Sequence, residues 1–330
     1  MLNATSSDMA FFDRGLGTPG SPGSPGWRTA DTPHDRSGQR ALASRYGGDN
    51  MKLITWNIQR GRGLHNTCSI ERVVADLERM ADFDVLCLQE VSAGYTDQPG
   101  SDGANQFMQL ARRLRGFTPV GGVATDVMGE DGARQLFGNM ILSRYPVVQV
   151  LRHALPWPVD AQVMSMQRGA LEVTLNTPLG LVRVSTTHLE YFSPVQRAAQ
   201  VERLRELHRD AWLHAQATRP GEAIHGPFAA VPRAGKALLT GDFNFLPDSA
   251  EYERLQAPYD DDVPAYRDAW VQSHPFQPHE PTVGLRDEST RPFTFDFIFA
   301  SADLAPRIRS MRVASEIAGP DHQPILIKLA

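Results

Sequence analysis

The stretch Gly241-Asp242-Phe243-Asn244, which directly follows the apolar run Ala237–Thr240, constrains this chain more than any other feature. A short apolar run of this kind predicts a buried β-strand. Side chains alternate between the two faces of a strand, so Asp242 and Asn244 point to one side and Phe243 points to the other. The end of the strand therefore presents two oxygen-bearing side chains, which can hold a water molecule and a phosphate oxygen.

The composition favours a compact intracellular protein. The chain has 330 residues, of which 41% are hydrophobic, enough for one large α/β domain or two smaller ones. Its net charge of −5 gives no sign of the basic face with which proteins grip long nucleic acids. Only two cysteines occur, and Cys87 lies inside an apolar run, so no disulfide framework is expected. With no apolar run of membrane-spanning length and no signal peptide, a cytoplasmic location is expected.

Residues 1–50 differ from the rest of the chain. They include the run Gly17–Gly26, which is rich in Gly, Pro and Ser and cannot bury enough apolar surface to offset the entropy of ordering. We expect a disordered tail here and a catalytic domain over residues 51–330. One hypothesis is that Met51 is the true start codon, and the alternative is a genuine flexible tail.

From Met51 onward, strand and helix patterns alternate. We expect a helix over residues 69–80 with Ser69 as N-cap, another near 105–114, and a long one starting at Ser193, where Pro194 and Gln196 complete a capping box. Strands are expected at residues 53–58, 84–91, 139–142, 147–151, 170–175, 181–187, 237–240, 293–300, 307–315 and 324–329. Several hairpins interrupt the strict βα alternation, which favours mixed sheets packed face to face with helices outside.

Polar side chains recur where these strands end or are interrupted. They are Asn57, Glu90, His188, Asp296 and the pair Asp321-His322. Each has an ordinary explanation when taken alone: Asn57 starts turns well, Glu90 can be a solvated strand end, and a lone His188 is more often structural. An acid such as Asp296 between aromatic residues needs a partner, and an imidazole N–H is the obvious one.

Some of these residues suit binding of a cation and a phosphate group. One carboxylate and one carboxamide, from Glu90 and Asn57, match the oxygen ligands that Mg²⁺ prefers. Arg168 precedes the strand pattern of residues 169–173 and can hold a phosphate oxygen through a bidentate contact, although simple surface exposure is the alternative.

Taken in order, the motifs resemble those of the endonuclease/exonuclease/phosphatase superfamily, which includes deoxyribonuclease I, exonuclease III, inositol-polyphosphate 5-phosphatases and neutral sphingomyelinases. The resemblance covers essentially all of residues 51–330. The motifs that carry it are Thr55-Trp56-Asn57-Ile58-Gln59, Leu88-Gln89-Glu90-Val91, Gly138–Arg144, Thr187-His188-Leu189-Glu190, Gly241-Asp242-Phe243-Asn244, Phe295–Phe299 and Asp321-His322-Gln323-Pro324. The full ordered set is specific, while any one motif is not.

The resemblance implies a four-layer αββα sandwich, of α+β class, with the site at one edge of two packed mixed sheets. It implies a metal site for Mg²⁺ or Mn²⁺ formed by Asn57, Glu90 and Asp321. The catalytic residues that it implies are Asp242, Asn244, His188, His322 and Asp296, and the phosphate-binding residues are Arg168 and Asn139. Asp242 would orient or deprotonate the attacking water, and Asp296 would fix the tautomer of His322.

The resemblance leaves the substrate open. The leading hypothesis is a metal-dependent phosphodiesterase or phosphatase acting on a small or single-stranded substrate, with no membrane span and no obligate protein partner. The alternatives are a DNA endonuclease or exonuclease and, less favoured, an inactive binding module with the same fold. Gln59 stands where some abasic-site nucleases have an acidic ligand, which disfavours that narrower type. The candidate substrate loops are residues 92–106, 121–138, 152–167 and 272–292, and Trp157 within them is expected to pack into the core rather than to stack on a substrate.

Overall fold

The computed structural model describes residues 50–63, 67–217, 226–227, 229, 231–289, 291–317 and 321–330. The predicted tail over residues 1–50 therefore lies, apart from Asn50, outside the described residues. Among the described residues, no helix is both long enough and apolar enough to cross a membrane.

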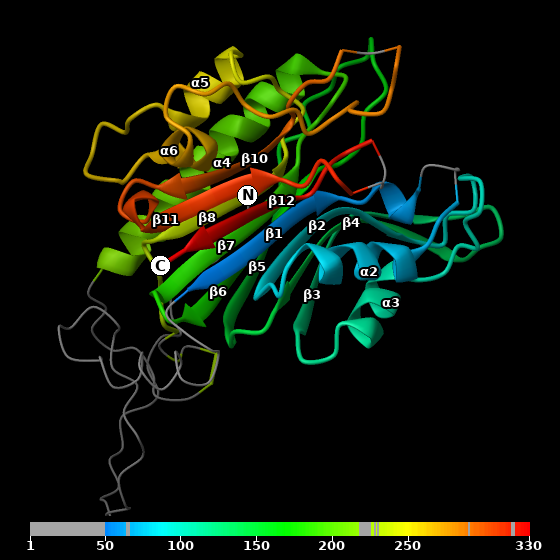
Figure 1. The fold of residues 1–330 in the computed structure, drawn as a ribbon, viewed down its shortest axis with the longest axis horizontal. Coiled ribbons are helices and arrows are strands. Elements are labelled where there is room, and N and C mark those ends of the chain that lie inside the picture. Colours follow the sequence, from blue (N-terminus) through cyan, green and yellow to red (C-terminus); the bar gives the residue numbers. More distant parts are fainter. Residues whose placement is uncertain are drawn as a thin grey trace, which may run out of the picture.

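Two six-stranded sheets make up the centre of the molecule (Figure 1). The first sheet has the strand order β11 (Ile308–Val313), β12 (Ile325–Leu329), β1 (Met51–Asn57), β2 (Val85–Ala93), β4 (Arg134–Ser143) and β3 (Thr118–Met128). The second has the order β5 (Val147–Ala154), β6 (Gly169–Thr177), β7 (Gly180–His188), β8 (Ala237–Asp242), β10 (Asp296–Ser301) and β9 (Tyr266–Asp268). Both sheets are mixed, because β1 and β2 pair in parallel, as do β7 and β8, while the other pairs are antiparallel.

Helices cover the outer face of each sheet (Figure 1). The helical elements are η1 (Gln59–Gly61), α2 (Ile70–Met80), α3 (Gln106–Arg113), α4 (Pro194–Gln216), α5 (Ala250–Gln256), α6 (Ala269–Ser273) and η2 (Ala305–Arg307). The expected N-caps Ser69 and Ser193 are confirmed, and Asn105 caps α3 in the same way: the three side chains accept hydrogen bonds from backbone N–H groups in the first turns of α2, α3 and α4. The capping box expected at Ser193 is not completed, because the side chain of Gln196 donates to the carbonyl of Pro158 instead. Each cap satisfies a donor that the helix itself leaves unpaired.

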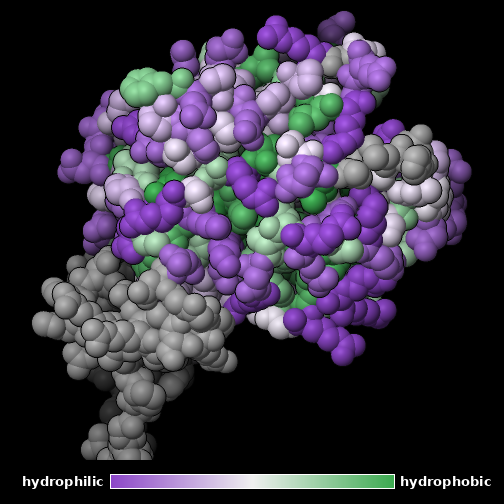
Figure 2. All heavy atoms as spheres, in the orientation of Figure 1, coloured by the Kyte–Doolittle hydropathy of each residue, from purple (hydrophilic) through white to green (hydrophobic). Residues whose placement is uncertain are grey.

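Three apolar layers separate these elements. Side chains such as Ile141 and Val184 fill the space between the sheets. Leu77 of α2 packs on the other face of the first sheet, and Leu204 of α4 packs on the outer face of the second. Full burial of one such side chain stabilises a fold by about 1.5–3 kcal/mol. On the face shown in Figure 2, hydrophilic side chains cover the helical layers, and hydrophobic ones appear mainly in the band between them. The four-layer αββα sandwich is confirmed.

The main differences from the sequence-based expectations lie at the sheet margins. Residues 121–138, expected as a loop, mostly belong to the edge strand β3 and to β4. Strand β3 is largely exposed, so it lacks an apolar signature, and it carries two glycines. A Cβ atom at Gly122 would lie 2.7 Å from the Cβ atom of Leu171, so glycine permits the close approach of the two sheets. The expectation that Trp157 packs into the core is wrong, because its side chain is 50% exposed.

Candidate active site

The first sheet contributes two oxygen-bearing side chains from neighbouring parallel strands. Strand β1 ends at Asn57, which is completely buried. Strand β2 has a bulge between Leu88 and Val91, and within it Glu90 adopts a left-handed backbone conformation with φ of 57°. Positive φ is unfavourable for a non-glycine residue and clusters at functional sites. The Nδ2 atom of Asn57 donates to Oε1 of Glu90 at 3.0 Å, so the bulge brings the carboxylate onto the end of β1.

The second sheet contributes three further side chains from adjacent strands. His188 at the end of β7 is in register with Asp242 at the end of the parallel strand β8. Asp242 is also in register with Asp296, the first residue of the antiparallel strand β10. Paired residues in a ladder lie side by side, so these three groups occupy one edge of the sheet.

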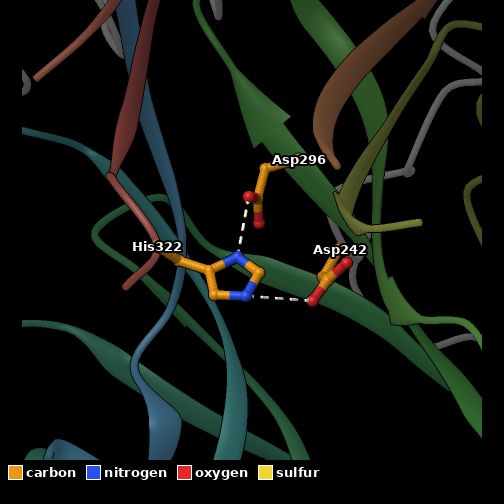
Figure 3. A group of neighbouring side chains, drawn as sticks. All are labelled: Asp242, Asp296 and His322. Carbon is orange, nitrogen blue, oxygen red and sulfur yellow. Dashed lines mark hydrogen bonds and ion pairs between the residues drawn. The ribbon is translucent and has the colours of Figure 1, made fainter. Parts of the chain in front are cut away.

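The two sheets meet at Asp242. Its Oδ2 atom accepts a hydrogen bond from Nδ2 of Asn57 at 2.9 Å and lies 3.5 Å from Nε2 of His188. It also lies 3.6 Å from Nε2 of His322, a residue in the loop before β12 of the first sheet. Figure 3 shows the His322 ring between Asp242 and Asp296, with Nδ1 at 2.8 Å from Oδ2 of Asp296. Asn57 and His322, which are 265 positions apart in the sequence, thus both lie next to the carboxylate of Asp242.

The charges of Asp242 and His322 depend on each other. Burial raises the pKa of Asp242 to about 7, although the neighbouring His322 opposes the shift. Burial alone would lower the pKa of His322, but the carboxylates of Asp296 and Asp242 outweigh it and raise the value to about 10. Thr282 supports Asp296 through a 2.7 Å hydrogen bond from its hydroxyl to Oδ2. At neutral pH His322 therefore holds a proton and carries a positive charge between two acids.

His188 has the opposite character. Its pKa lies well below the usual value, because of burial first and then the nearby charges of Arg168 and His322. The ring is therefore neutral. Its Nδ1 atom is buried and has no hydrogen-bond partner among the described residues. Such an atom is costly to bury unless a ligand or water completes it.

Arg168 and Glu190 lie beside His188. Nε of Arg168 donates to Oε2 of Glu190 at 3.2 Å, and both side chains are buried. Nη1 of Arg168 is buried and lacks a partner within the described ranges, so it remains available to an anion. The sequence interpretation gave Glu190 no role, although this residue stands in the same motif as His188. Its buried position against an arginine was the missing information.

The two remaining amides differ in their surroundings. Asn244 has φ of 52°, its N–H donates to Oδ1 of Asp242 at 3.1 Å, and its Nδ2 donates to the carbonyl of Leu189. It therefore contacts Asp242 through its backbone N–H, and the expected alternation of the two side chains along one strand is not observed, because β8 ends at Asp242. The Nδ2 atom of Asn139 donates to the carbonyl of Gly169 at 3.0 Å, which ties the first sheet to the second and engages the amide nitrogen predicted to bind phosphate.

Asp321 lies at the rim of the site. Its side chain is half exposed, and Oδ1 lies 4.0 Å from Nε2 of His322. Its backbone N–H donates to the side chain of Gln59 at 3.4 Å, which brings the loop before β12 next to the end of β1. The carboxylate therefore adds negative charge to the same edge as Glu90 and Asp242.

The donor atoms are suitable for a divalent cation. Asp242, Asp296 and His322 each offer a ligand atom within 4.8 Å of one another. Both ring nitrogens of His322 face carboxylates, with Nδ1 2.8 Å from Asp296 and Nε2 3.6 Å from Asp242. The sequence-based assignment of a hard cation such as Mg²⁺ to Asn57, Glu90 and Asp321 stays a prediction, since the amide oxygen of Asn57 accepts from the N–H of Gln59 at 3.0 Å.

The chain belongs to the endonuclease/exonuclease/phosphatase family. The model of this family, described as "Endonuclease/Exonuclease/phosphatase family", matches residues 54–316. The family that the sequence motifs indicate is thus confirmed. A comparison with curated proteins finds no match to this chain.

Solved structures share the fold. An endonuclease/exonuclease/phosphatase from Beutenbergia cavernae matches with a TM-score of 0.58 and 22% identity, over 85% of this chain and 71% of that chain. A mannosyl-6-phosphatase from Bacteroides thetaiotaomicron matches with a TM-score of 0.57 and 16% identity, over 85% and 99% of the two chains. Truncated TDP2 from Caenorhabditis elegans matches with a TM-score of 0.56 and 18% identity, over 85% and 97%. At these identities the similarity establishes the fold alone.

Proposed function

We propose that this protein is a divalent-metal-dependent hydrolase that cleaves phosphoester bonds, as a phosphodiesterase or phosphatase. The observation that carries the proposal is the convergence of Asn57, His188 and His322 on one carboxylate oxygen of Asp242. The family membership supports phosphoester chemistry, and one neighbour of the same fold is named as a phosphatase.

In this proposal, Asn57, Glu90 and Asp321 hold Mg²⁺ or Mn²⁺, which neutralises phosphate charge and polarises a P–O bond when bound. Asp242 orients the attacking water and accepts its proton as the water oxygen bonds to phosphorus. A buried carboxyl group whose pKa is raised toward neutrality is well matched to proton transfer at physiological pH.

The remaining residues act on the phosphate oxygens. Arg168, through the Nη1 atom that has no partner among the described residues, and neutral His188 bind non-bridging oxygens, with Asn244 beside them. His322, held by Asp296, presents a cation to the charge that grows as the P–O bond to the leaving group breaks. Fixed donors of this kind each contribute on the order of 3 kcal/mol to transition-state stabilisation.

Hydrolysis of bis-p-nitrophenyl phosphate with added Mg²⁺ or Mn²⁺, and again with EDTA, tests the proposal. We expect turnover that requires the metal and that disappears in Asp242→Asn. Asp261→Asn makes the same chemical change at an ion pair with Arg209, away from the site, and should retain activity. No metal-dependent turnover would favour an inactive binding module instead. Parallel assays with p-nitrophenyl phosphate, inositol phosphates, sphingomyelin, oligonucleotides and plasmid DNA separate phosphatase, phosphodiesterase and nuclease.

A further inference from the structure

Four aromatic side chains form a continuous row at the edge of the second sheet. Tyr191 and Phe192 follow β7, and Phe293 and Phe295 precede β10. The ring centroids of Tyr191 and Phe192 are 4.9 Å apart with a perpendicular, edge-to-face arrangement. Tyr191 lies 6.3 Å from Phe295, which lies 4.6 Å from Phe293. Tyr191 is 53% exposed and Phe192 47%, so their rings are open to a ligand.

The row flanks the candidate active site. Tyr191 comes three residues after His188, and Phe295 directly precedes Asp296, which contacts His322. Phe295 lies two residues before Phe297, whose ring packs in the apolar layer beneath α4. The aromatic row therefore borders the catalytic residues on the α4 side of the sheet edge, while Asp296 itself points to His322.

Hydrogen bonds fix the loop that carries the two exposed rings. Nη1 of Arg197 donates to the carbonyls of Glu190 and Tyr191, each at 3.0 Å. The N–H of Phe192 donates to Oε1 of Glu190 at 2.9 Å, while the other oxygen of Glu190 accepts from Arg168. One buried carboxylate thus connects the ring-bearing loop to the arginine proposed to bind phosphate. Rings that are already fixed lose little entropy on binding.

We propose that this row is a binding site for a nucleobase attached to the scissile phosphate through its sugar, an inference that rests on the proposed function. The edge-to-face pair of Tyr191 and Phe192 forms a corner that offers one ring face for stacking and one ring edge for a T-shaped contact, both suited to a flat aromatic ligand. A flexible acyl chain gains no such directional contact. The net charge of −5 further favours a mononucleotide or short oligonucleotide over a long duplex.

Calorimetric titration of the Mg²⁺-loaded protein with two phosphates tests the site. Adenosine 5′-monophosphate and ribose 5-phosphate share the phosphate and the pentose and differ in the base. Stacking on an aromatic side chain contributes about 1–3 kcal/mol per base, so the nucleotide should bind about 5- to 150-fold more tightly. Tyr191→Leu keeps apolar area but removes the ring, and should reduce this ratio at least about fivefold. Tyr191→Phe should retain it, as should Phe276→Ala, which removes a fully exposed ring elsewhere.

Equal affinity for the two phosphates in the wild-type protein would refute the nucleobase site while leaving phosphoester hydrolysis intact. An unchanged ratio in the double variant Tyr191→Leu/Phe192→Leu would refute it as well. Tighter binding of long-chain acyl phosphates than of adenosine 5′-monophosphate would assign the row to lipid instead. Failure to bind either phosphate, together with no metal-dependent hydrolysis of bis-p-nitrophenyl phosphate, would refute the proposed function itself.

Discussion

His208 should make the stability of this protein fall as the pH is lowered from about 7.5 to 5. The side chain is buried in α4, with Nδ1 at 2.8 Å from Nη2 of Arg183 and Nε2 at 2.8 Å from the carbonyl of Pro264. The arginine can only donate and the carbonyl can only accept, so the ring must be the neutral tautomer with a proton on Nε2. Burial, followed by the charge of Arg183, lowers the pKa of His208 to about 3.

The size of the effect follows from linkage. The unfolded chain takes up a proton near the ordinary pKa of about 6.5, whereas the folded chain does so only near 3, so the unfolded state binds more protons between these values. Stability therefore rises with pH in this window and is lost as the pH falls. At about pH 5 the loss is about 2 kcal/mol relative to pH 7.5, since each full pH unit of the window is worth about 1.4 kcal/mol.

Other groups near His208 affect whether its imidazole can carry a charge. Arg183 is itself paired with Glu172 at 2.8 Å, and the ring of Tyr266 lies 4.3 Å from that of His208. Arg205 adds a further positive charge that disfavours the imidazolium form. No acid contacts the imidazole directly among the described residues, and the carbonyl of Pro264 offsets the lowered pKa of His208 only in part.

Urea unfolding in EDTA at several pH values measures this contribution. Carboxylates also titrate, so the diagnostic quantity is the difference between wild type and His208→Gln. The variant should lose about 2 kcal/mol less between pH 7.5 and 5. His214→Gln, an exposed position on the same helix, supplies the matched control. Parallel curves for wild type and His208→Gln would refute a neutral buried His208.

The remaining predictions concern the active site. Glu90→Gln should raise the Mg²⁺ concentration needed for half-maximal activity, and an unshifted metal titration would remove Glu90 from the metal site. Asp242→Ala should lower kcat at least about 10³-fold with a nearly unchanged melting temperature, as measured by steady-state kinetics and circular dichroism; retained turnover would contradict its role. Asp296→Asn should lower kcat about 10- to 100-fold with little change in KM, because the amide keeps an acceptor oxygen but removes the negative charge that favours protonated His322 at 2.8 Å. Arg168→Lys should raise KM, and an unaltered KM would exclude phosphate binding by its guanidinium.

The sequence alone predicted the strands that end in candidate site residues. Buried apolar runs followed by a polar residue located the ends of β1, β7 and β8, and the serine caps located α2 and α4. These signals are local, since periodicity and capping act over a few residues. The edge strand β3 and the three-residue β9 were missed because an exposed or very short strand has no apolar pattern.

The geometry of the site depended on contacts that no local pattern encodes. The bulge at Glu90 depends on the pairing of β2 with β4, and the amide of Asn57 is shared by two carboxylates only when the two sheets pack together. The exposure of Trp157 was also unpredictable, because its loop lies on the surface, with the indole N–H donating to Ser165. The sequence gives no sign that Tyr191 and Phe192 differ from ordinary loop residues, because their contact with Phe295 forms only in the folded chain.

The division of the candidate site between two sheets has a consequence for how the protein tolerates substitutions. Asn57 and Glu90 belong to one half of the sandwich and Asp242 and His188 to the other, and the hydrogen bond from Gln89 to Thr186 is a direct polar link between the halves. A relative shift of the two sheets by a fraction of an ångström would misalign the reactive groups without unfolding either sheet. Turnover should therefore detect a misalignment of the two sheets that leaves the thermal denaturation curve unchanged.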